Sequence, residues 1–387
     1  AAGVLPDGAC DPRLEVDLGW SRFQAGEGPE RVLSGFLDAA QRAARAGDHA
    51  GELALRVDHA AYELVYEGTT AAADRARALA DDARQVFEAS GDDWGLSVVY
   101  STILMAQETQ AQPWADILAT AERIVTHARR AGADMIARFG ENNYVAAQQE
   151  GATPVNECLR WLDEHPHLER QSVLPLRSRF LAMLGRFDEA RELQARSAER
   201  LAELGSIRGP LILALRRYYV SMLEGDYLLA EAAGREMCER VLATGELGNF
   251  LEFSSMLALA LLALGRDEEA DEWLERAQAA APTGAVNPRV LWRQAKAKVL
   301  ARRGEHAEAE QVAREAVAIG DGGDALNLQA DAYADLAEVL LLAGKPDGAA
   351  AALEQALDRY GRKGNLVSAQ RTRERLSGLS RTGATAR

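Results

Sequence analysis

The stretch that decides the fold is MLALALLALGRDEEADEWLERAQAAAP, residues 256–282. Its apolar residues recur at helical spacing on both sides of Gly265, as they do on the buried face of an α-helix. Gly265 can adopt the left-handed conformation that ends a helix, and Asp267 and Glu268 suit the positive start of the next helix. Pro282 marks where that second helix stops. The stretch therefore predicts a hairpin of two helices.

The same turn recurs through the second half of the chain. Five glycines lie 40, 40, 39 and 40 residues apart, and an alanine follows each of them five positions later. A fixed period of this length is typical of a solenoid, whose units bury their apolar faces against one another. We expect the small alanines to let the two helices of a hairpin approach closely. The glycines are Gly185, Gly225, Gly265, Gly304 and Gly344, and the alanines are Ala190, Ala230, Ala270, Ala309 and Ala349.

Weaker turns continue this period toward the N-terminus. They lie at Gly28, at Gly68, near Gln110 and at Gly151. Strands have little to be built from, because Ala and Leu dominate and aromatic residues make up only 6% of the chain. The sequence therefore predicts an all-α solenoid of about nine helical hairpins.

The boundaries of the array follow from where the helical pattern begins and ends. We expect the array over residues 13–378, with a flexible leader at 1–12 and a disordered tail at 379–387. The first residue is not Met, which suggests a piece of a longer protein.

One irregularity interrupts the repeat near residues 165–175. Gly151 and Gly185 are only 34 residues apart, and Pro166 and Pro175 lie between them. A helix cannot run through both prolines. The favoured interpretation is a long connection followed by a shortened helix that starts near Leu174. The alternative is a hinge between two sub-arrays.

Residues for chemistry are absent or scattered. The three cysteines form no CxxC pair, and His165 and His167 have no third metal ligand near them in sequence. No HExxH, GxSxG, GxGxxG or GxxxxGK[ST] motif occurs with its structural context. DGGDA at 321–325 has no strand before it, so we interpret it as a linker. We expect no catalytic residue, no cofactor and no metal site.

Charge and hydropathy restrict the partners. The formal net charge of −15 repels phosphate backbones, so direct nucleic-acid binding is not expected. No run approaches the roughly 18 apolar residues of a membrane span, and the start, AAGVLPDGAC, has neither the basic nor the apolar part of a signal peptide. We therefore expect a cytoplasmic protein.

The hairpin around Gly265 resembles a tetratricopeptide repeat. Ala270, Leu274, Ala277 and Pro282 fall where that family places its small, large, small and proline signature residues. The resemblance implies that the hairpins stack into a right-handed superhelix. Several units have longer spacers than the usual repeat, which leaves the superhelical pitch open.

A closer resemblance covers most of the chain. The segments 11–48, 290–319 and 325–376 are similar to the C-terminal arm of large bacterial signalling proteins. In that family, a cyclase or transcription-factor domain precedes a P-loop ATPase of the signal-transduction type, and the arm follows. The resemblance implies an arm that senses a partner or effector and reports to the ATPase. Neither the ATPase motif nor a cyclase pattern is present here, so no catalytic residue is carried over.

The binding surface expected from the resemblance is the concave face, formed by the first helix of each hairpin. The mixed charge of its polar positions suits a peptide or a polar small molecule, and each position is as readily explained as an ordinary solvated one. Counting back from the turn residues gives the candidates Asp58, Tyr62, Arg138, Glu141, Gln148, Arg179, Tyr219, Glu252, Gln294, Lys298 and Glu338.

Two functions remain open from the sequence. The first is a non-catalytic scaffold that binds a protein or peptide partner, as the arm of a larger regulatory ATPase or cyclase-type protein. The second is a receptor for a polar small molecule held in the superhelix, whose binding favours one homo-oligomeric state.

Overall fold

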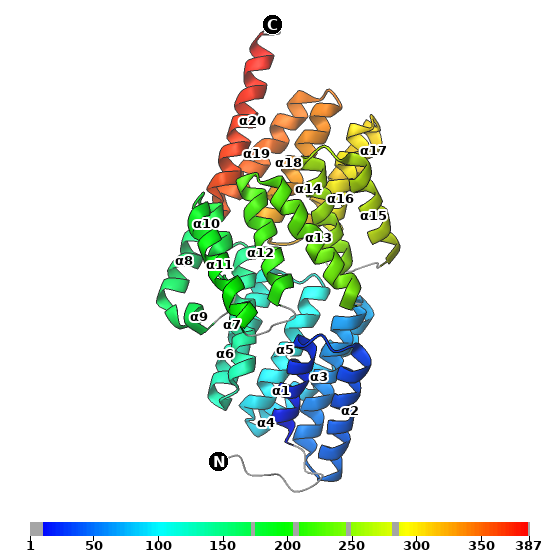
Figure 1. The fold of residues 1–387 in the computed structure, drawn as a ribbon, viewed down its shortest axis with the longest axis vertical. Helices are drawn as coiled ribbons and strands as arrows, with labels where there is room; N and C mark the ends of the chain where they lie inside the picture. Colours follow the sequence, from blue (N-terminus) through cyan, green and yellow to red (C-terminus); the bar gives the residue numbers. More distant parts are fainter. Residues whose placement is uncertain (1–10, 172–174, 204–208, 245–248, 281–285, 386–387) are drawn as a thin grey trace.

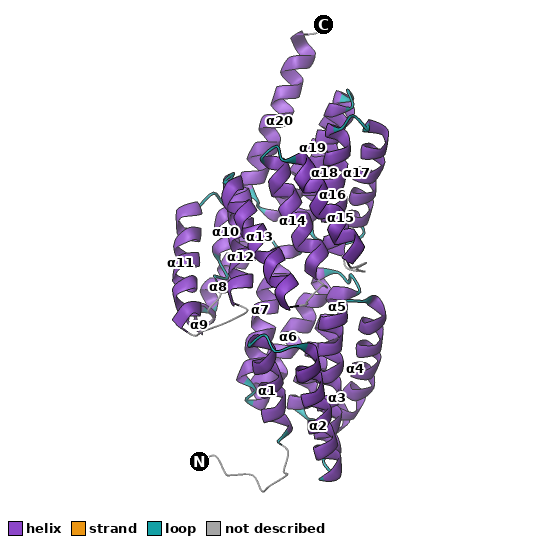
Figure 2. Cartoon of the chain, turned by 45° about the vertical axis from the view of Figure 1, so that its right-hand side comes forward, coloured by secondary structure: helices purple, strands orange, loops and turns teal. Residues whose placement is uncertain are grey.

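The protein is described here by a computed structural model that covers residues 11–171, 175–203, 209–244, 249–280 and 286–385. Every regular element in these ranges is helical (Figure 2). None of these helices is both long enough and apolar enough to cross a membrane. The all-α prediction is confirmed.

The first seven helices form the lower lobe of Figure 1. Asp48, Thr69 and Asp92 cap three of them, because each side chain accepts a hydrogen bond from a backbone N–H of the first turn. The bounds are α1 (Pro12–Gln24), α2 (Pro29–Arg45), α3 (His49–Glu67), α4 (Thr70–Ser90), α5 (Asp93–Thr109), α6 (Trp114–Ala131) and α7 (Asp134–Glu150).

The next four helices lie beside the two lobes and contain the irregular segment. One helix ends at Glu164, and a six-residue helix begins at Pro166, where the missing N–H costs nothing. The expected helix start near Leu174 lies outside the described residues, and the following helix begins at Ser178. The bounds are α8 (Val155–Glu164), α9 (Pro166–Gln171), α10 (Ser178–Met183) and α11 (Phe187–Glu203).

The remaining nine helices form the upper lobe. The last helix continues to Thr385, past residue 378, where we expected the array to end and a disordered tail to begin. The bounds are α12 (Gly209–Glu224), α13 (Tyr227–Thr244), α14 (Phe250–Ala263), α15 (Asp267–Ala280), α16 (Val286–Arg302), α17 (His306–Asp321), α18 (Leu326–Leu342), α19 (Pro346–Lys363) and α20 (Leu366–Thr385).

The helices pair into hairpins as the period predicts. Across the described ranges, nine packed pairs run from α1–α2 to α18–α19, and only α9 and α20 stand outside them. The five turn glycines have φ between 71° and 93°, and the alanine five positions after each is completely buried. At the weaker turns, Gly68 has φ 63°, whereas Gly28 and Gly151 have negative φ. The predicted number of hairpins is confirmed.

The end of the array folds back onto its middle. The buried Lys363 ammonium at the end of α19 donates hydrogen bonds of 2.6, 2.6 and 2.9 Å to the carbonyl oxygens of Gln148, Gly151 and Thr153. Asp324, before α18, accepts bonds from the backbone N–H of Trp114 and Ala115 at the start of α6. These contacts hold the lower and upper lobes together.

The final helix closes the upper lobe. Arg371 on α20 donates to the carbonyl oxygens of Met222 and Leu223 at the end of α12, at 3.3 and 2.7 Å. Asn365, before α20, donates to Asn327 on α18, and Asn327 in turn contacts the sulfur of Met183 on α10. The first helices of the last five hairpins and α20 therefore surround a common interior.

Candidate functional site

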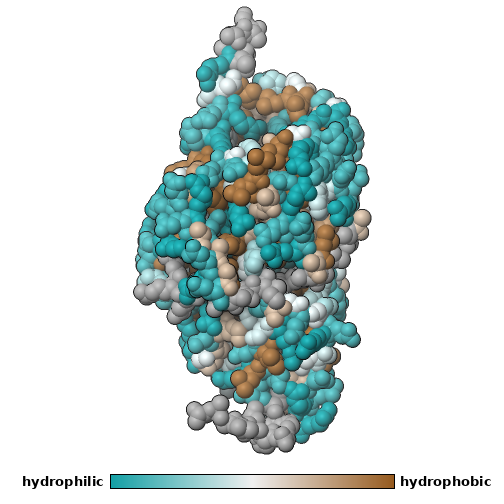
Figure 3. Space-filling view, viewed as in Figure 1, coloured by the Kyte–Doolittle hydropathy of each residue, from teal (hydrophilic) through white to brown (hydrophobic). Residues whose placement is uncertain are grey.

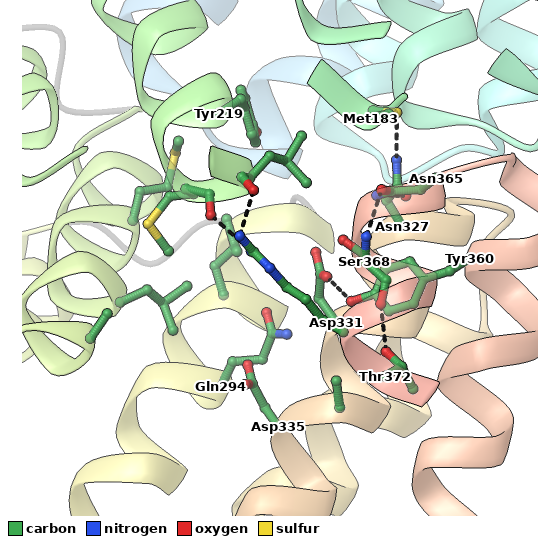
Figure 4. A pocket seen from close by; sticks show the side chains of 18 of the residues that line it. Met183, Tyr219, Gln294, Asn327, Asp331, Asp335, Tyr360, Asn365, Ser368 and Thr372 are labelled. Carbon is green, nitrogen blue, oxygen red and sulfur yellow. Dashed lines mark hydrogen bonds between the residues drawn. The ribbon is translucent and has the colours of Figure 1, made fainter. Parts of the chain in front are cut away.

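That interior holds a large cavity of about 640 Å³, which we call the upper cavity. Its lining comes from α10, α12, α14, α16, α18 and α20, together with residues beside them. Figure 4 shows how side chains from these helices converge. Because each of the last five hairpins contributes its first helix, the cavity is the concave face of this part of the solenoid.

One wall of the upper cavity is apolar and rich in methionine. The chain has six methionines, and Met183, Met222 and Met256 all line this space. Leu259 and Leu291 extend the wall. Methionine is flexible and polarisable, so a surface of this kind adapts to apolar ligand groups of different shape.

Another part of the lining carries charged side chains from α16 and α18, which we call the charged stripe. Lys298 on α16 lies 3.0 Å from Asp335 and 2.9 Å from Glu338, both on α18. Arg302 pairs with Glu338 as well, at 3.3 Å. Burial alone would lower the pKa of Lys298, but the two carboxylates outweigh it and raise the pKa. This lysine therefore stays charged and is held by both acids.

Two acceptor groups beside these ion pairs are less well satisfied: the carboxylate of Asp331 and the amide oxygen of Gln294. Asp331 accepts a hydrogen bond from the hydroxyl of Tyr360, and among the described residues no basic group lies within 4 Å of its carboxylate. Burial raises the pKa of Asp331 to about 6. Gln294 is only 1% exposed, and its Oε1 receives no hydrogen bond from any described group. In Figure 4 these two side chains and Asp335 point into the same part of the cavity.

Arg179 and Tyr219 lie where the upper cavity adjoins a second cavity. Arg179 on α10 forms an ion pair with Glu150 at the end of α7. The guanidinium carbon of Arg179 lies 3.7 Å from the ring centroid of Tyr219, which is a close cation–π contact. Tyr219 lines both spaces.

The second space, the middle cavity, lies between the lobes and has a volume of about 420 Å³. Glu108, Glu150 and Glu252 line it, with Trp114 and Met105. Burial raises the pKa of Glu108 to about 7, and burial together with the neighbouring glutamates raises the pKa of Glu252 to about 7. The middle cavity therefore loses negative charge as the pH falls toward 6.

The eleven predicted groove residues do not all come together. Five of them line the upper cavity, and one of those, Tyr219, also lines the middle cavity with Glu252. Asp58 and Tyr62 line a small cavity of about 40 Å³ in the lower lobe. The five in the upper cavity are Arg179, Tyr219, Gln294, Lys298 and Glu338.

In the lower lobe, aromatic rings fill much of the space around Asp58 and Tyr62. Tyr62 stacks on Phe36 with ring centroids 5.1 Å apart, and Trp20 meets Phe139 edge to face at 5.8 Å. The concave surface expected near Asp58 is therefore mostly core. The sequence pattern placed Asp58 and Tyr62 on the correct face of α3, but it could not show that side chains of other helices pack against that face.

Three predicted residues lie outside these three cavities. Arg138 is exposed. Glu141 is buried and pairs with Arg129 at 2.5 Å. Gln148 is buried, and its carbonyl oxygen accepts one of the Lys363 bonds. The ion pair of Glu141 explains that residue without a ligand, whereas the Oε1 atom of Gln148 is a buried acceptor that receives no hydrogen bond from any described group.

Several residues of the upper cavity escaped the prediction. Asp331 and Asp335 precede Glu338 by seven and three positions, so one helix face carries all three, and that spacing is visible in the sequence. Arg371 and Asn365 had no such signal, because their place depends on how α20 returns to α12 and α18. Tyr218 and Tyr219 both line the cavity, although adjacent helical residues point to different faces.

Comparison with known proteins supports the repeat. Residues 251–283 and 287–362 match family models described as tetratricopeptide repeat. No match was found among curated protein sequences.

The described residues contain no group of three or more His, Cys, Asp or Glu side chains that could hold a metal ion.

Several solved structures are similar to this chain. The Cut9–Hcn1 hetero-tetramer of the APC/C matches with 14% identity over 91% of this chain and 72% of the other, at a TM-score of 0.50. A thermophilic tetratricopeptide protein of Thermus thermophilus matches with 24% identity, covering 53% of this chain and 96% of that one, at 0.36. A Rap protein complexed with competence and sporulation factor matches with 11% identity over 97% and 99%, at 0.38. The chain is thus an α-solenoid with tetratricopeptide repeats, a fold typical of protein–protein interaction.

Proposed function

We propose that this protein is a non-catalytic scaffold that binds an extended segment of a partner protein in the upper cavity. The observation that carries the proposal is the mixed apolar and charged lining. Met183, Met222 and Met256 offer adaptable apolar contacts, and Lys298 and Asp331 add charged groups to the same lining. Such a surface suits an extended peptide, because one peptide can present both apolar and charged side chains to it.

The outer surface supports the same assignment. On the face shown in Figure 3, apolar side chains form short, separate groups among hydrophilic ones. Isolated groups of this kind are normal on a soluble domain, whereas a docking surface presents a broad continuous patch. The upper cavity is therefore the better candidate on the part of the surface that this view shows.

Blocking the cavity tests the proposal directly. Ala263 ends α14, is exposed, and lines the upper cavity, so Ala263→Trp would fill part of the space. Ala351→Trp makes the same change at an exposed position of α19 and serves as the control. Binders selected from a random 12-residue peptide library on the wild-type protein should lose affinity for the first variant only. Equal affinity for all three proteins would place binding elsewhere.

We also propose that the scaffold is the sensor arm of a larger cytoplasmic regulatory ATPase or cyclase-type signalling protein. This part rests on the likeness of segments 11–48, 290–319 and 325–376 to such arms. The reading frame around the 387 codons tests it, since a P-loop ATPase should be encoded there. In that full protein, peptide binding should change the rate of ATP hydrolysis. An ATPase rate that ignores both the peptide and Ala263→Trp would contradict the proposal.

A receptor for a polar small molecule is the alternative. The volume of about 640 Å³ favours it, because it falls within the range of roughly 300–1,000 Å³ that holds drug-sized ligands. Native mass spectrometry of the purified protein separates the two functions. A co-purifying small molecule that Ala263→Trp no longer retains would favour the receptor, and its binding should then shift the oligomeric state. If the spectrum shows only the mass of the protein, and the protein binds the selected peptides, the scaffold is favoured.

A further inference from the structure

We propose that the upper cavity anchors a basic group of its ligand, an arginine or lysine side chain, between Asp331 and Gln294. This inference rests on the proposed function, because it names the chemistry that the same cavity selects. It starts from two acceptors on neighbouring helices, α18 and α16, that line one part of the cavity.

The first observation is the buried amide of Gln294. Its Oε1 atom is fully covered, and within the described part of the chain no donor reaches it. A buried acceptor without a donor costs free energy, so such atoms are rare unless a water or ligand completes them. Gln294 lines the upper cavity, and Figure 4 shows its side chain directed into that space. A ligand with N–H groups would satisfy it.

The second observation is the carboxylate of Asp331. Its partner is the Tyr360 hydroxyl, a neutral donor. Among the described residues no cation forms an ion pair with it, and Arg179, which is paired with Glu150, acts on its charge only from farther away. Asp335 adds a second negative charge nearby, which contributes to the raised pKa of Asp331. A carboxylate in this position attracts a cation that brings its own donors.

The basic residues that line the cavity are already engaged. Lys298 bridges Asp335 and Glu338, and Arg179 pairs with Glu150. Arg371 donates to the carbonyl oxygens at the end of α12, and Arg375 donates to the carbonyl oxygen of Ala334. None of these contacts supplies Asp331 or Gln294 Oε1 with a donor.

The chemistry of the ligand group follows from these positions. A guanidinium or ammonium group offers several N–H donors, enough for one carboxylate and one amide oxygen at once. The aliphatic stem of such a side chain is apolar and would pack on the methionine wall around Met222 and Met256. The cavity thus fits a basic side chain better than an acidic or a purely apolar one.

The test uses three fluorescent probes in polarisation assays with the whole chain. The first is a degenerate 12-residue peptide pool with arginine fixed at its centre. The second is the same pool with citrulline, which keeps the shape of arginine but carries no charge. The third is labelled argininamide, a free basic group. We expect the arginine pool to bind at least about tenfold tighter than the citrulline pool, the change expected for one charge-assisted hydrogen bond.

Two variants identify the anchor. Asp331→Asn should remove the preference for arginine, whereas Asp347→Asn, an identical change at an exposed position of α19, should keep it. Gln294→Met removes the buried acceptor, so it should weaken binding of the arginine pool and raise the thermal midpoint of the free protein. A merely structural glutamine would show no such opposite effects.

The outcomes are distinguishable. If no pool binds, both the proposed peptide scaffold and this inference are wrong. If both pools bind equally, or if Asp331→Asn keeps the preference, the scaffold stands and the basic anchor is wrong. If argininamide binds as tightly as the arginine pool and depends on Asp331, the anchor stands and the ligand is a small cation, as the receptor alternative requires.

Discussion

Lys363 donates a 2.6 Å hydrogen bond from its Nζ to the carbonyl oxygen of Gln148, 215 positions earlier in the chain. Its ammonium also reaches the carbonyl oxygens of Gly151 and Thr153, and the residue is completely buried. The end of α7 and the connection after it leave carbonyl groups without helical partners, and this one cation satisfies three of them. The contact joins the last hairpin to the middle of the solenoid.

Replacing this lysine tests how much the closure contributes. Lys363→Met keeps the apolar stem but leaves three carbonyl groups without their donor, so we expect the free energy of unfolding to fall by more than about 3 kcal/mol. Urea unfolding followed by circular dichroism measures this. Lys345→Met is the control, because that lysine is 57% exposed and its pair with Glu310 should contribute less than about 1 kcal/mol. Equal losses would show that the closure adds nothing.

Asp324, about 210 positions later in the chain, is expected to stabilise the start of α6. Its carboxylate accepts bonds of 2.7 and 2.9 Å from the N–H groups of Trp114 and Ala115, which have no helical acceptor. Asp324→Ala should cost about 1–2 kcal/mol and speed amide hydrogen exchange in the first turn of α6. Asp347→Ala, in the first turn of α19, is the matched change at an exposed acid. Unchanged exchange in α6 would show that the bond does not form in solution.

Replacing each of two glycines by alanine should change the stability of the protein in opposite directions. Gly265 has φ +74° with open space around its Cβ position, so Gly265→Ala should destabilise the protein by about 1–2 kcal/mol through backbone conformation alone. Gly361 lies inside α19, also with open space, and Gly361→Ala should stabilise by about 0.5–1 kcal/mol. Thermal unfolding of the two variants measures both. Two changes of the same sign would contradict the assigned turn.

Asp58 should make stability depend on pH. Burial, and then the nearby charge of Asp17, raise the pKa of Asp58 to about 7 from an ordinary value near 4. The folded state therefore holds a proton that the unfolded state has lost, and wild-type stability should fall as the pH rises from about 4 to 7. Asp58→Asn should gain stability relative to wild type over this interval, measured by urea unfolding at pH 5 and pH 8. For Asp347→Asn, the difference in unfolding free energy from wild type should be the same at pH 5 and pH 8. If the difference for Asp58→Asn is also the same at both pH values, the raised pKa of Asp58 is refuted.

The candidate residues show where sequence-based prediction succeeds. Gln294, Lys298 and Glu338 were placed on the concave face by counting helical turns back from Gly304 and Gly344, and all three line the upper cavity. The counting works because a short glycine turn fixes the phase of the helix before it. The same rule put Asp58 and Tyr62 on the correct face of α3, but rings from neighbouring helices fill that space.

The sequence by itself determined the repeating unit of this protein. The period of 39 or 40 residues, the glycines with positive φ and the buried alanines are local features, set by backbone geometry and helical spacing within one hairpin. Only the tertiary structure decided that the solenoid closes on itself. The contacts of Lys363, Asp324 and Arg371 join helices far apart in the chain, and small rotations between successive hairpins add up before they meet. No local pattern encodes that sum, so the cavity and its unpaired acceptors are visible only in three dimensions.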